Sequence, residues 1–238
     1  MLRRLAAACA ETRRFAEAAA YNDEALALAR AAGDPRTETQ VLNNLGVLHS
    51  QMGERDREIE YLSQAVELAR THGIHEMEAM GLANIAFSLS DLGRHDEAIG
   101  HAAEALRIHR TLPEGVPRAS ALGILGRAQR RGGRYADSLA SYREGLAVSE
   151  RTGASYMQAE CLDGIGLALV HLSGPAEGVP YLERALGLFT AMGHRRGEEV
   201  RAELVRLRGP GQEGTRESPD PHAASPGVSR VRSPGEGP

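Results

Sequence analysis

The sequence predicts an all-α protein built as a solenoid of stacked helix–turn–helix repeats. Three observations lead to this fold class. Small residues recur with a period of 40 along most of the 238-residue chain. Apolar residues between them follow the three- and four-residue spacing of a helix. Tryptophan is absent and aromatic residues make up 4% of the chain, so the core must be mainly aliphatic and alanine-rich, which favours helices. Repeats of this kind bury their apolar faces by stacking on one another.

The period of 40 is carried by four series of small residues. They are Gly46, Ala86, Gly126 and Gly166, with Ala6 before them; Ala25, Ala65, Ala105, Gly145 and Ala185; Gly53, Gly93 and Gly133; and Gly33, Gly73, Gly153 and Gly193, with Pro113 in the missing place. The first two series predict close crossings between helices. The last two predict helix ends, because glycine adopts the left-handed conformation at low cost.

These stops and the apolar stripes between them predict eleven helices. A stripe of this kind is Val41, Leu42, Leu45 and Leu48, and Asp34 followed by Pro35 is a typical helix start. The expected helices are 2–12, 15–32, 36–52, 55–72, 75–92, 95–111, 117–131, 135–152, 155–172, 175–192 and 196–208. They form five repeats over about 1–34, 35–74, 75–114, 115–154 and 155–194, the first truncated, and a capping helix over 195–208.

The small and bulky positions together resemble the tetratricopeptide repeat family. The matching residues are Leu42, Leu45-Gly46, Leu62 and Ala65; Leu82, Ile85-Ala86, Ala98 and Ala105; Leu122, Leu125-Gly126, Tyr142 and Gly145; and Leu162, Ile165-Gly166, Leu182 and Ala185. Glu58 replaces a second-helix alanine, and the period exceeds the usual 34 or so residues. The length resembles the long-helix subtype of kinesin light chains. Residues 181–204 resemble the C-terminal repeat arm of bacterial antibiotic-pathway regulators of the NB-ARC type. The resemblance implies a right-handed superhelix.

The two ends of the chain differ in composition. The first helix lacks most of a first turn, so we expect either a fragment of a larger regulator or an open N-terminal edge on which a second copy can stack. Residues 209–238 are rich in Gly, Pro and Ser and hold almost no apolar bulk. Such a segment cannot offset the entropy of ordering, so it is predicted to be disordered.

The sequence offers no motif for catalysis, and we expect neither an enzyme nor a cofactor. Lysine is absent, which excludes a Walker lysine, and neither HExxH nor GxSxG occurs. His72 and His75 flank a turn without further ligands, so no metal site is expected. The formal charge of −4 disfavours nucleic acid as a partner. Cys9 and Cys161 are expected to be buried free thiols, and no stretch is long enough to span a membrane. These features favour a cytoplasmic, bacterial protein.

The family resemblance also implies where a partner binds. In such solenoids the first helix of each repeat lines a concave groove. Carried onto this chain, the candidate groove residues are Gln40, Asn43, Asn44, Val47, Ser50, Met80, Asn84, Phe87, Arg127, Arg130, Arg131, Glu160 and Asp163. The resemblance therefore implies a protein–protein interaction module that binds a peptide or a partner domain. The alternative is the sensor arm of a transcriptional or signalling regulator whose effector domains lie outside this chain.

The groove chemistry leaves two pairs of interpretations open. The asparagines can hydrogen-bond an extended peptide backbone, or they can bond one another between helices. The cluster Arg127, Arg130 and Arg131 suits a carboxylate or phosphate, or it is a solvated helix end whose charge complements the helix dipole. Val47, Met80 and Phe87 are expected to hold an apolar side chain of the partner.

Overall fold

The computed structural model describes residues 1–209. Within this range the chain forms eleven helices and no strand, and each predicted helix is confirmed to within one residue at either end. The helices are α1 (Leu2–Glu11), α2 (Phe15–Ala31), α3 (Pro35–Met52), α4 (Arg55–Thr71), α5 (His75–Asp91), α6 (His95–Thr111), α7 (Val116–Arg131), α8 (Tyr135–Thr152), α9 (Ser155–Ser173), α10 (Pro175–Ala191) and α11 (Arg196–Arg208). The segment predicted to be disordered lies, apart from Gly209, outside the described residues.

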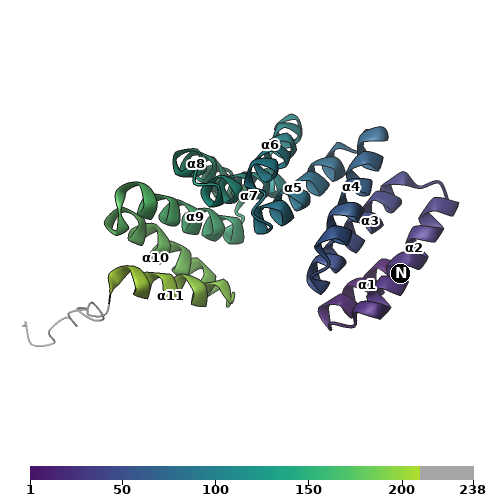
Figure 1. Cartoon of the computed structure of the whole chain (residues 1–238), viewed down its shortest axis with the longest axis horizontal. Coiled ribbons are helices and arrows are strands. Elements are labelled where there is room, and N and C mark those ends of the chain that lie inside the picture. The colour runs from purple at the N-terminus through teal and green to yellow at the C-terminus, as the bar shows by residue number, and fades with distance from the viewer. Residues whose placement is uncertain (210–238) are drawn as a thin grey trace, which may run out of the picture.

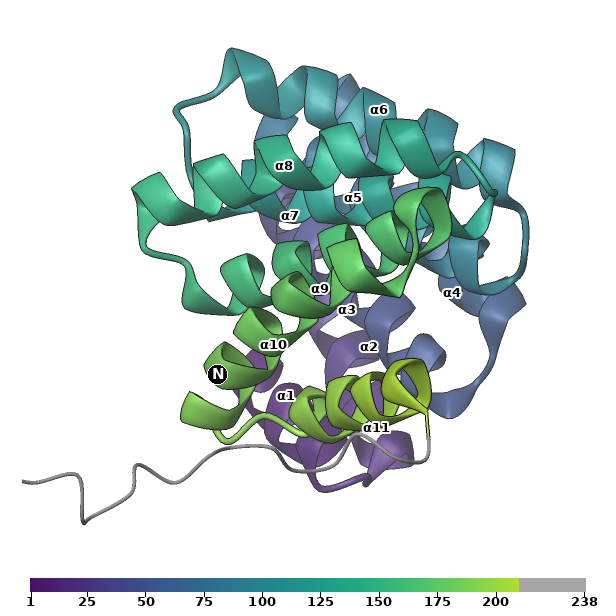
Figure 2. The same ribbon diagram turned by 90° about the vertical axis from the view of Figure 1, so that its left-hand side faces the viewer.

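The helices are arranged as an arc of antiparallel pairs (Figure 1). Each helix packs on the next along the chain, and α5 and α9 also contact α7, so alternate helices share one side of the arc. In both views α6 and α8 lie on the outer side and α5 and α7 lie inside them (Figures 1 and 2). The first helices of the repeats therefore form the concave side, as the family resemblance implied. No helix in residues 1–209 is long and apolar enough to cross a membrane.

The small-residue series has the packing role that the sequence predicted. A Cβ on Gly46 would lie 2.7 Å from Leu62 Cγ, and one on Gly166 would lie 2.7 Å from Leu182 Cγ. A methyl group would therefore collide with the second helix of the same repeat. At the helix ends, Gly53 and Gly93 have φ values of 78° and 79°, the left-handed conformation that favours glycine.

One departure from the family pattern is accommodated by local hydrogen bonds. Glu58 is buried where the other repeats carry a small residue. Its carboxylate accepts a hydrogen bond from Ser88 Oγ and pairs with Arg55 Nη1 at 2.7 Å. These partners compensate for burying a charge inside the helix stack.

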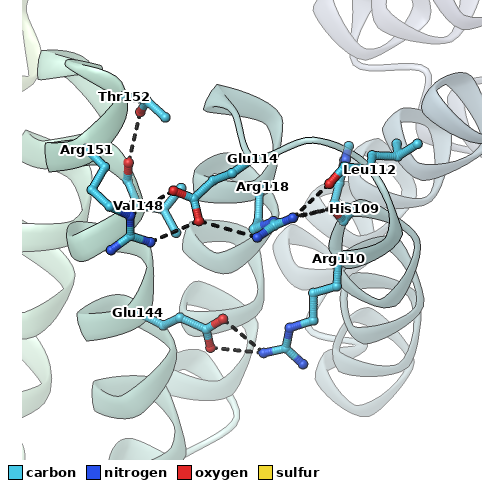
Figure 3. A network of polar contacts seen from close by, with 9 residues as sticks. All are labelled: His109, Arg110, Leu112, Glu114, Arg118, Glu144, Val148, Arg151 and Thr152. Carbon is cyan, nitrogen blue, oxygen red and sulfur yellow. Dashed lines mark hydrogen bonds and ion pairs between the residues drawn. The ribbon is translucent and has the colours of Figure 1, made fainter.

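The turn between α6 and α7 differs from the other turns between repeats because Pro113 stands where they have Gly33, Gly73, Gly153 and Gly193. Leu112 is extended, with φ −99° and ψ 162°, so the backbone leaves α6 without a glycine cap. Arg118 supplies the missing donors: its Nη2 donates to the carbonyl oxygens of His109 at 3.0 Å and Leu112 at 2.9 Å. Glu114 then links Arg118, at 3.3 Å, to Arg151 of α8, at 2.7 Å (Figure 3). The turn is thus braced against both neighbouring helices.

The core is mainly aliphatic, as the composition predicted, and it is divided into clusters between neighbouring helices. Both cysteines are free and buried, and burial raises the pKa of the Cys161 thiol to about 12. At the C-terminal end Val200 and Leu204 of α11 are buried against Phe189. This packing confirms α11 as a capping helix, and most of its charged residues are exposed, whereas Arg196 and Glu203 are half-buried.

Candidate functional site

The inner helices expose apolar side chains on the concave face. Val47 of α3 and Met80 and Phe87 of α5 retain 41%, 37% and 39% of their accessible surface. All three were predicted groove residues. Large apolar groups left in contact with water on one face of a folded protein are typical of a surface that binds a partner.

The first of two cavities on this face lies beside the braced turn, and we call it the turn pocket. Its volume is about 550 Å³. The apolar part of its lining is Met77, Met80, Leu112, Pro113, Pro117 and Ile124. Predicted residues Gln40 and Asn84 lie at its polar margin, together with His109 and Arg118. Burial lowers the pKa of His109, which favours its neutral form near neutral pH, so the charged groups of this lining are Glu76 and Arg118.

The second cavity, the arginine pocket, adjoins the turn pocket and has a volume of about 490 Å³. It is lined from α5, α7, α8, α9 and α11, and it shares Ser120 and Ile124 with the turn pocket. The predicted residues Phe87, Arg127, Arg130, Arg131, Glu160 and Asp163 all line it. The structure thus brings six of the predicted residues into one cavity of the size that binding sites usually have.

Two of the three arginines from α7 share one carboxylate. Arg127 Nη2 lies 2.6 Å from Asp91 Oδ1, and Arg131 pairs with the same oxygen. The guanidinium carbon of Arg127 also lies 4.2 Å from the centroid of the Phe87 ring, a cation–π contact. These contacts hold one wall of the pocket in a fixed geometry.

Arg130 differs from its two neighbours. Among residues 1–209 it has no acidic partner within ion-pair distance, and its buried Nε atom has no hydrogen-bond partner. The side chain lies near the Tyr142 hydroxyl, whose pKa is raised to about 12 by burial although Arg130 opposes this shift. Arg130 thus has no direct ion pair among the described residues, although its charge lowers the pKa of both Asp163 and Glu203.

The opposite wall carries acids that are held by the capping helix. Arg196 of α11 lies 2.8 Å from Asp163 Oδ2 and 3.6 Å from Glu160 Oε1. Burial raises the pKa of both acids, against the lowering effect of Arg196. Burial disfavours the charge of Arg196 itself, but its hydrogen bond and attraction to Asp163 prevail and its pKa is raised. Tyr156 donates a hydrogen bond of 3.3 Å to Glu160.

The asparagines bond one another between helices. Asn84 Nδ2 of α5 donates to Asn43 Oδ1 of α3 at 2.8 Å, and Asn43 is buried. This is the second of the two interpretations that the sequence left open, and it leaves the Asn43 acceptor occupied. Asn44 and Val47 lie apart from this pair, in a third cavity of about 240 Å³ next to α1. Ser50 accepts a hydrogen bond of 2.6 Å from Arg55 Nη1.

Several residues of the site were not predicted. Arg196 and Tyr156 line the arginine pocket, and His109, Leu112 and Arg118 line the turn pocket. The period itself contained a signal for the first two, because Arg196 lies 40 residues after Tyr156 at the start of the next inner helix. In the part of the chain that the structure describes, no group of three or more His, Cys, Asp or Glu residues is placed to hold a metal ion.

Solved structures with the same fold are similar to this chain at low sequence identity. BtubC (BKLC) from P. vanneervenii superposes with a TM-score of 0.70 at 19% identity, covering 95% of this chain and 85% of that one. Aspartyl phosphate phosphatase F from Bacillus subtilis superposes with a TM-score of 0.73 at 14% identity, covering 86% and 55%. A Rap protein complexed with competence and sporulation factor gives 0.70 at 15% identity, covering 85% and 56%. The chain thus spans just over half the length of the last two.

At these identities the structural likeness shows the fold alone. No curated protein matches the sequence. The sequence profile of the tetratricopeptide repeat matches residues 1–71 and 77–151, which is more than half of the chain. The chain therefore belongs to the tetratricopeptide repeat family.

Proposed function

We propose that this chain is a non-catalytic interaction module that binds a peptide segment of a partner protein in its concave groove. The observation that carries this proposal is the pair of adjoining cavities on the inner face, which share Ser120 and Ile124. Together they form a continuous hollow with an apolar part and a charged part. A peptide that crosses both would bury apolar side chains and satisfy polar ones at once.

The groove walls are fixed before a partner arrives, which supports a binding role. Asp91 ties α5 to α7, Arg196 ties α11 to α9, and Arg118 holds the turn that walls the turn pocket. A preorganised surface loses little conformational entropy when it binds, so more of the contact energy appears as affinity.

Capture of a partner from a native lysate tests this proposal. The groove variant carries Val47→Glu, Met80→Glu and Phe87→Glu, three exposed positions on the concave face. The matched control carries Leu28→Glu, Leu172→Glu and Met192→Glu, which are exposed to a similar or greater degree and line neither pocket. Both variants must first show the helical circular dichroism of the unmodified chain.

We expect the partner to be recovered with the unmodified chain and with the control but to be lost with the groove variant. In that variant binding would bury the introduced glutamates against apolar side chains of the partner, which is energetically costly. Equal recovery with both variants would exclude the groove as the binding surface. Loss with the control alone would place the interaction on the outer face or at the helix ends.

A second candidate is the sensor arm of a larger regulator. The structural likeness to phosphatase F and to the Rap protein complexed with competence and sporulation factor favours this candidate. In both cases this chain covers just over half of the other protein. In that case the groove would bind a regulatory peptide, and effector domains would be encoded beside this sequence. A Walker motif in the adjoining coding sequence would support the sensor arm, whereas a promoter immediately before Met1 would support a free-standing module.

A further inference from the structure

We propose that the third cavity, which lies at the seam between the first two repeats, binds a primary alkylammonium group such as a lysine side chain. We call it the seam cavity; it is lined from α1, α2 and α3. The inference goes beyond the proposed function, because the seam cavity is not one of the two adjoining cavities that carry that proposal. Three features carry it: a buried asparagine whose oxygen has no partner, a carboxylate, and a short apolar wall.

Asn22 of α2 stands at a position that belongs to the core in the other four repeats. The residues that follow it at intervals of 40 are Leu62, Ala102, Tyr142 and Leu182, and all four are buried in the core. Leu62 and Leu182 fill the space against a glycine of the first helix in their own repeats. In the first repeat an amide takes this place, and a cavity of about 240 Å³ lies beside it.

The amide of Asn22 lacks a partner that its burial requires. Asn22 is 3% exposed, and its Oδ1 atom has no hydrogen-bond partner within the described residues. A buried polar atom without a partner is destabilising. The oxygen and the amino group of an asparagine exchange places by a half-turn about the Cβ–Cγ bond, and Asn22 lines the seam cavity. The oxygen can therefore face the cavity, where a donor on a ligand would satisfy it.

The charge of the lining selects a cationic donor. Glu11, which is exposed, is the one charged residue among those that line the seam cavity. Asn44 and Gln51 add two amide oxygens. An ammonium group has three N–H donors and no acceptor, so it matches these oxygens and the carboxylate together. A carboxylate ligand would instead meet the negative charge of Glu11 and no cation.

The remainder of the lining suits an aliphatic stem. Ala6, Ala7, Ala10, Val47 and Leu48 supply the apolar surface of the seam cavity. Lysine buries its methylene groups along surface of this kind while its charged end stays at polar groups. This chain contains no lysine, so such a group must come from another molecule. Its source is either a lysine of a partner protein or a free aliphatic amine.

Nuclear magnetic resonance titration of the full chain tests the inference. The probe is Nα-acetyl-lysine N-methylamide, and the matched probe is Nα-acetyl-norleucine N-methylamide, which has the same carbon stem without the ammonium. We expect the lysine probe to shift the side-chain amide resonances of Asn22, Asn44 and Gln51. The norleucine probe should bind about tenfold more weakly or less, because it lacks the charged donor.

Two variants assign the binding to the seam cavity. Asn22→Leu introduces the residue found at positions 62 and 182, and it should weaken binding of the lysine probe about tenfold or more. It should also raise the Tm by about 2–4 °C, since it removes an unpartnered polar group from the core. Glu11→Gln should weaken binding up to about fivefold, as expected for an exposed ion pair. The control Glu24→Gln, an exposed acid of α2 outside the cavity, should bind as the unmodified chain does.

The source of the ammonium is decided by a second amine, cadaverine. Tighter binding of the lysine probe than of cadaverine would identify a lysine of a partner protein, and the reverse would identify a free amine; either result supports the ammonium site. Equal binding of the norleucine probe, binding that survives Asn22→Leu, or no shift with either amine would overturn the inference. None of these results affects the proposed function, because Asn22 lines neither of the adjoining cavities and the lysate capture tests that function separately.

Discussion

Glycines inside the helices fall into two groups according to the space around them. A Cβ on Gly164 would lie 2.2 Å from the ring of Tyr142, whereas a Cβ on Gly187 would meet nothing within 4 Å. Both residues are helical, and neither has a positive φ. The first glycine is needed for packing, and the second only weakens its helix.

This difference gives a pair of stability predictions with opposite signs. Gly164→Ala should lower the free energy of unfolding by about 1–3 kcal/mol, because the core would be overpacked. Gly187→Ala should raise it by about 0.5–1 kcal/mol, because alanine has less backbone entropy to lose. Urea denaturation followed by circular dichroism measures both. A destabilising Gly187→Ala, or a neutral Gly164→Ala, would contradict the packing described here.

Two glutamates should give opposite pH dependences of stability. Burial raises the pKa of the Glu160 carboxyl in the folded protein. As pH rises, the unfolded chain therefore releases the carboxyl proton at a lower pH than the folded protein does, and the stability that Glu160 contributes is lost. A hydrogen bond from Arg94 lowers the pKa of Glu97, so its contribution is present above the unfolded pKa and is lost as pH falls through the folded one.

Urea denaturation of Glu160→Gln and Glu97→Gln between about pH 4 and about pH 7 measures these contributions as differences from the unmodified chain. The stability advantage of Glu160 over glutamine should shrink as pH rises, while that of Glu97 should grow. The same slope for both variants would show that burial does not govern Glu160.

Single residues also show what the sequence could and could not predict at the site. Asp91 and Arg131 lie 40 residues apart, in the same register of adjacent repeats, so their pairing follows from the period. The pairing of Arg196 with Asp163 crosses 33 residues and depends on how α11, which packs on α10, is oriented relative to α9. The period places Arg196 at the start of an inner helix but does not specify this pairing, which is why its role in the site was missed.

At the scale of secondary structure, the helices were predictable and one turn was not. Most helix ends follow from glycines in the left-handed conformation, such as Gly53 and Gly153. Pro113 breaks that series, and the structure of its turn depends on a guanidinium five residues later in the chain. The turn pocket follows from this irregularity, so the sequence did not reveal it.

The brace of this turn is testable by comparing two arginines. Arg118→Ala should lower the free energy of unfolding by about 1–2 kcal/mol, because the last carbonyl groups of α6 lose a charged donor. Arg110 forms an exposed ion pair with Glu144, at 3.0 Å and with 55% and 45% of the two side chains exposed. Arg110→Ala should therefore cost less than about 0.5 kcal/mol. Equal losses in urea denaturation would show that Arg118 does not brace the turn.

At the scale of the whole molecule, the fold follows from repetition. Each repeat buries its apolar face only against its neighbours, so one period read from the sequence determines the stack and the identity of the inner helices. The shapes of the cavities between those helices depend on side-chain conformations and on ion pairs between repeats. For this reason the sequence could predict which residues face the groove but not which of them remain free to bind.

The central claim is that the concave groove is the binding surface, and site-specific photocrosslinking tests it most directly. A photoreactive benzoylphenylalanine would replace Phe87 in the groove or, in a matched chain, Leu172, which is 46% exposed and lines neither pocket. After illumination in a native lysate, we predict a crosslinked partner from position 87 and none from position 172. A partner crosslinked from position 172 and not from position 87 would contradict the account.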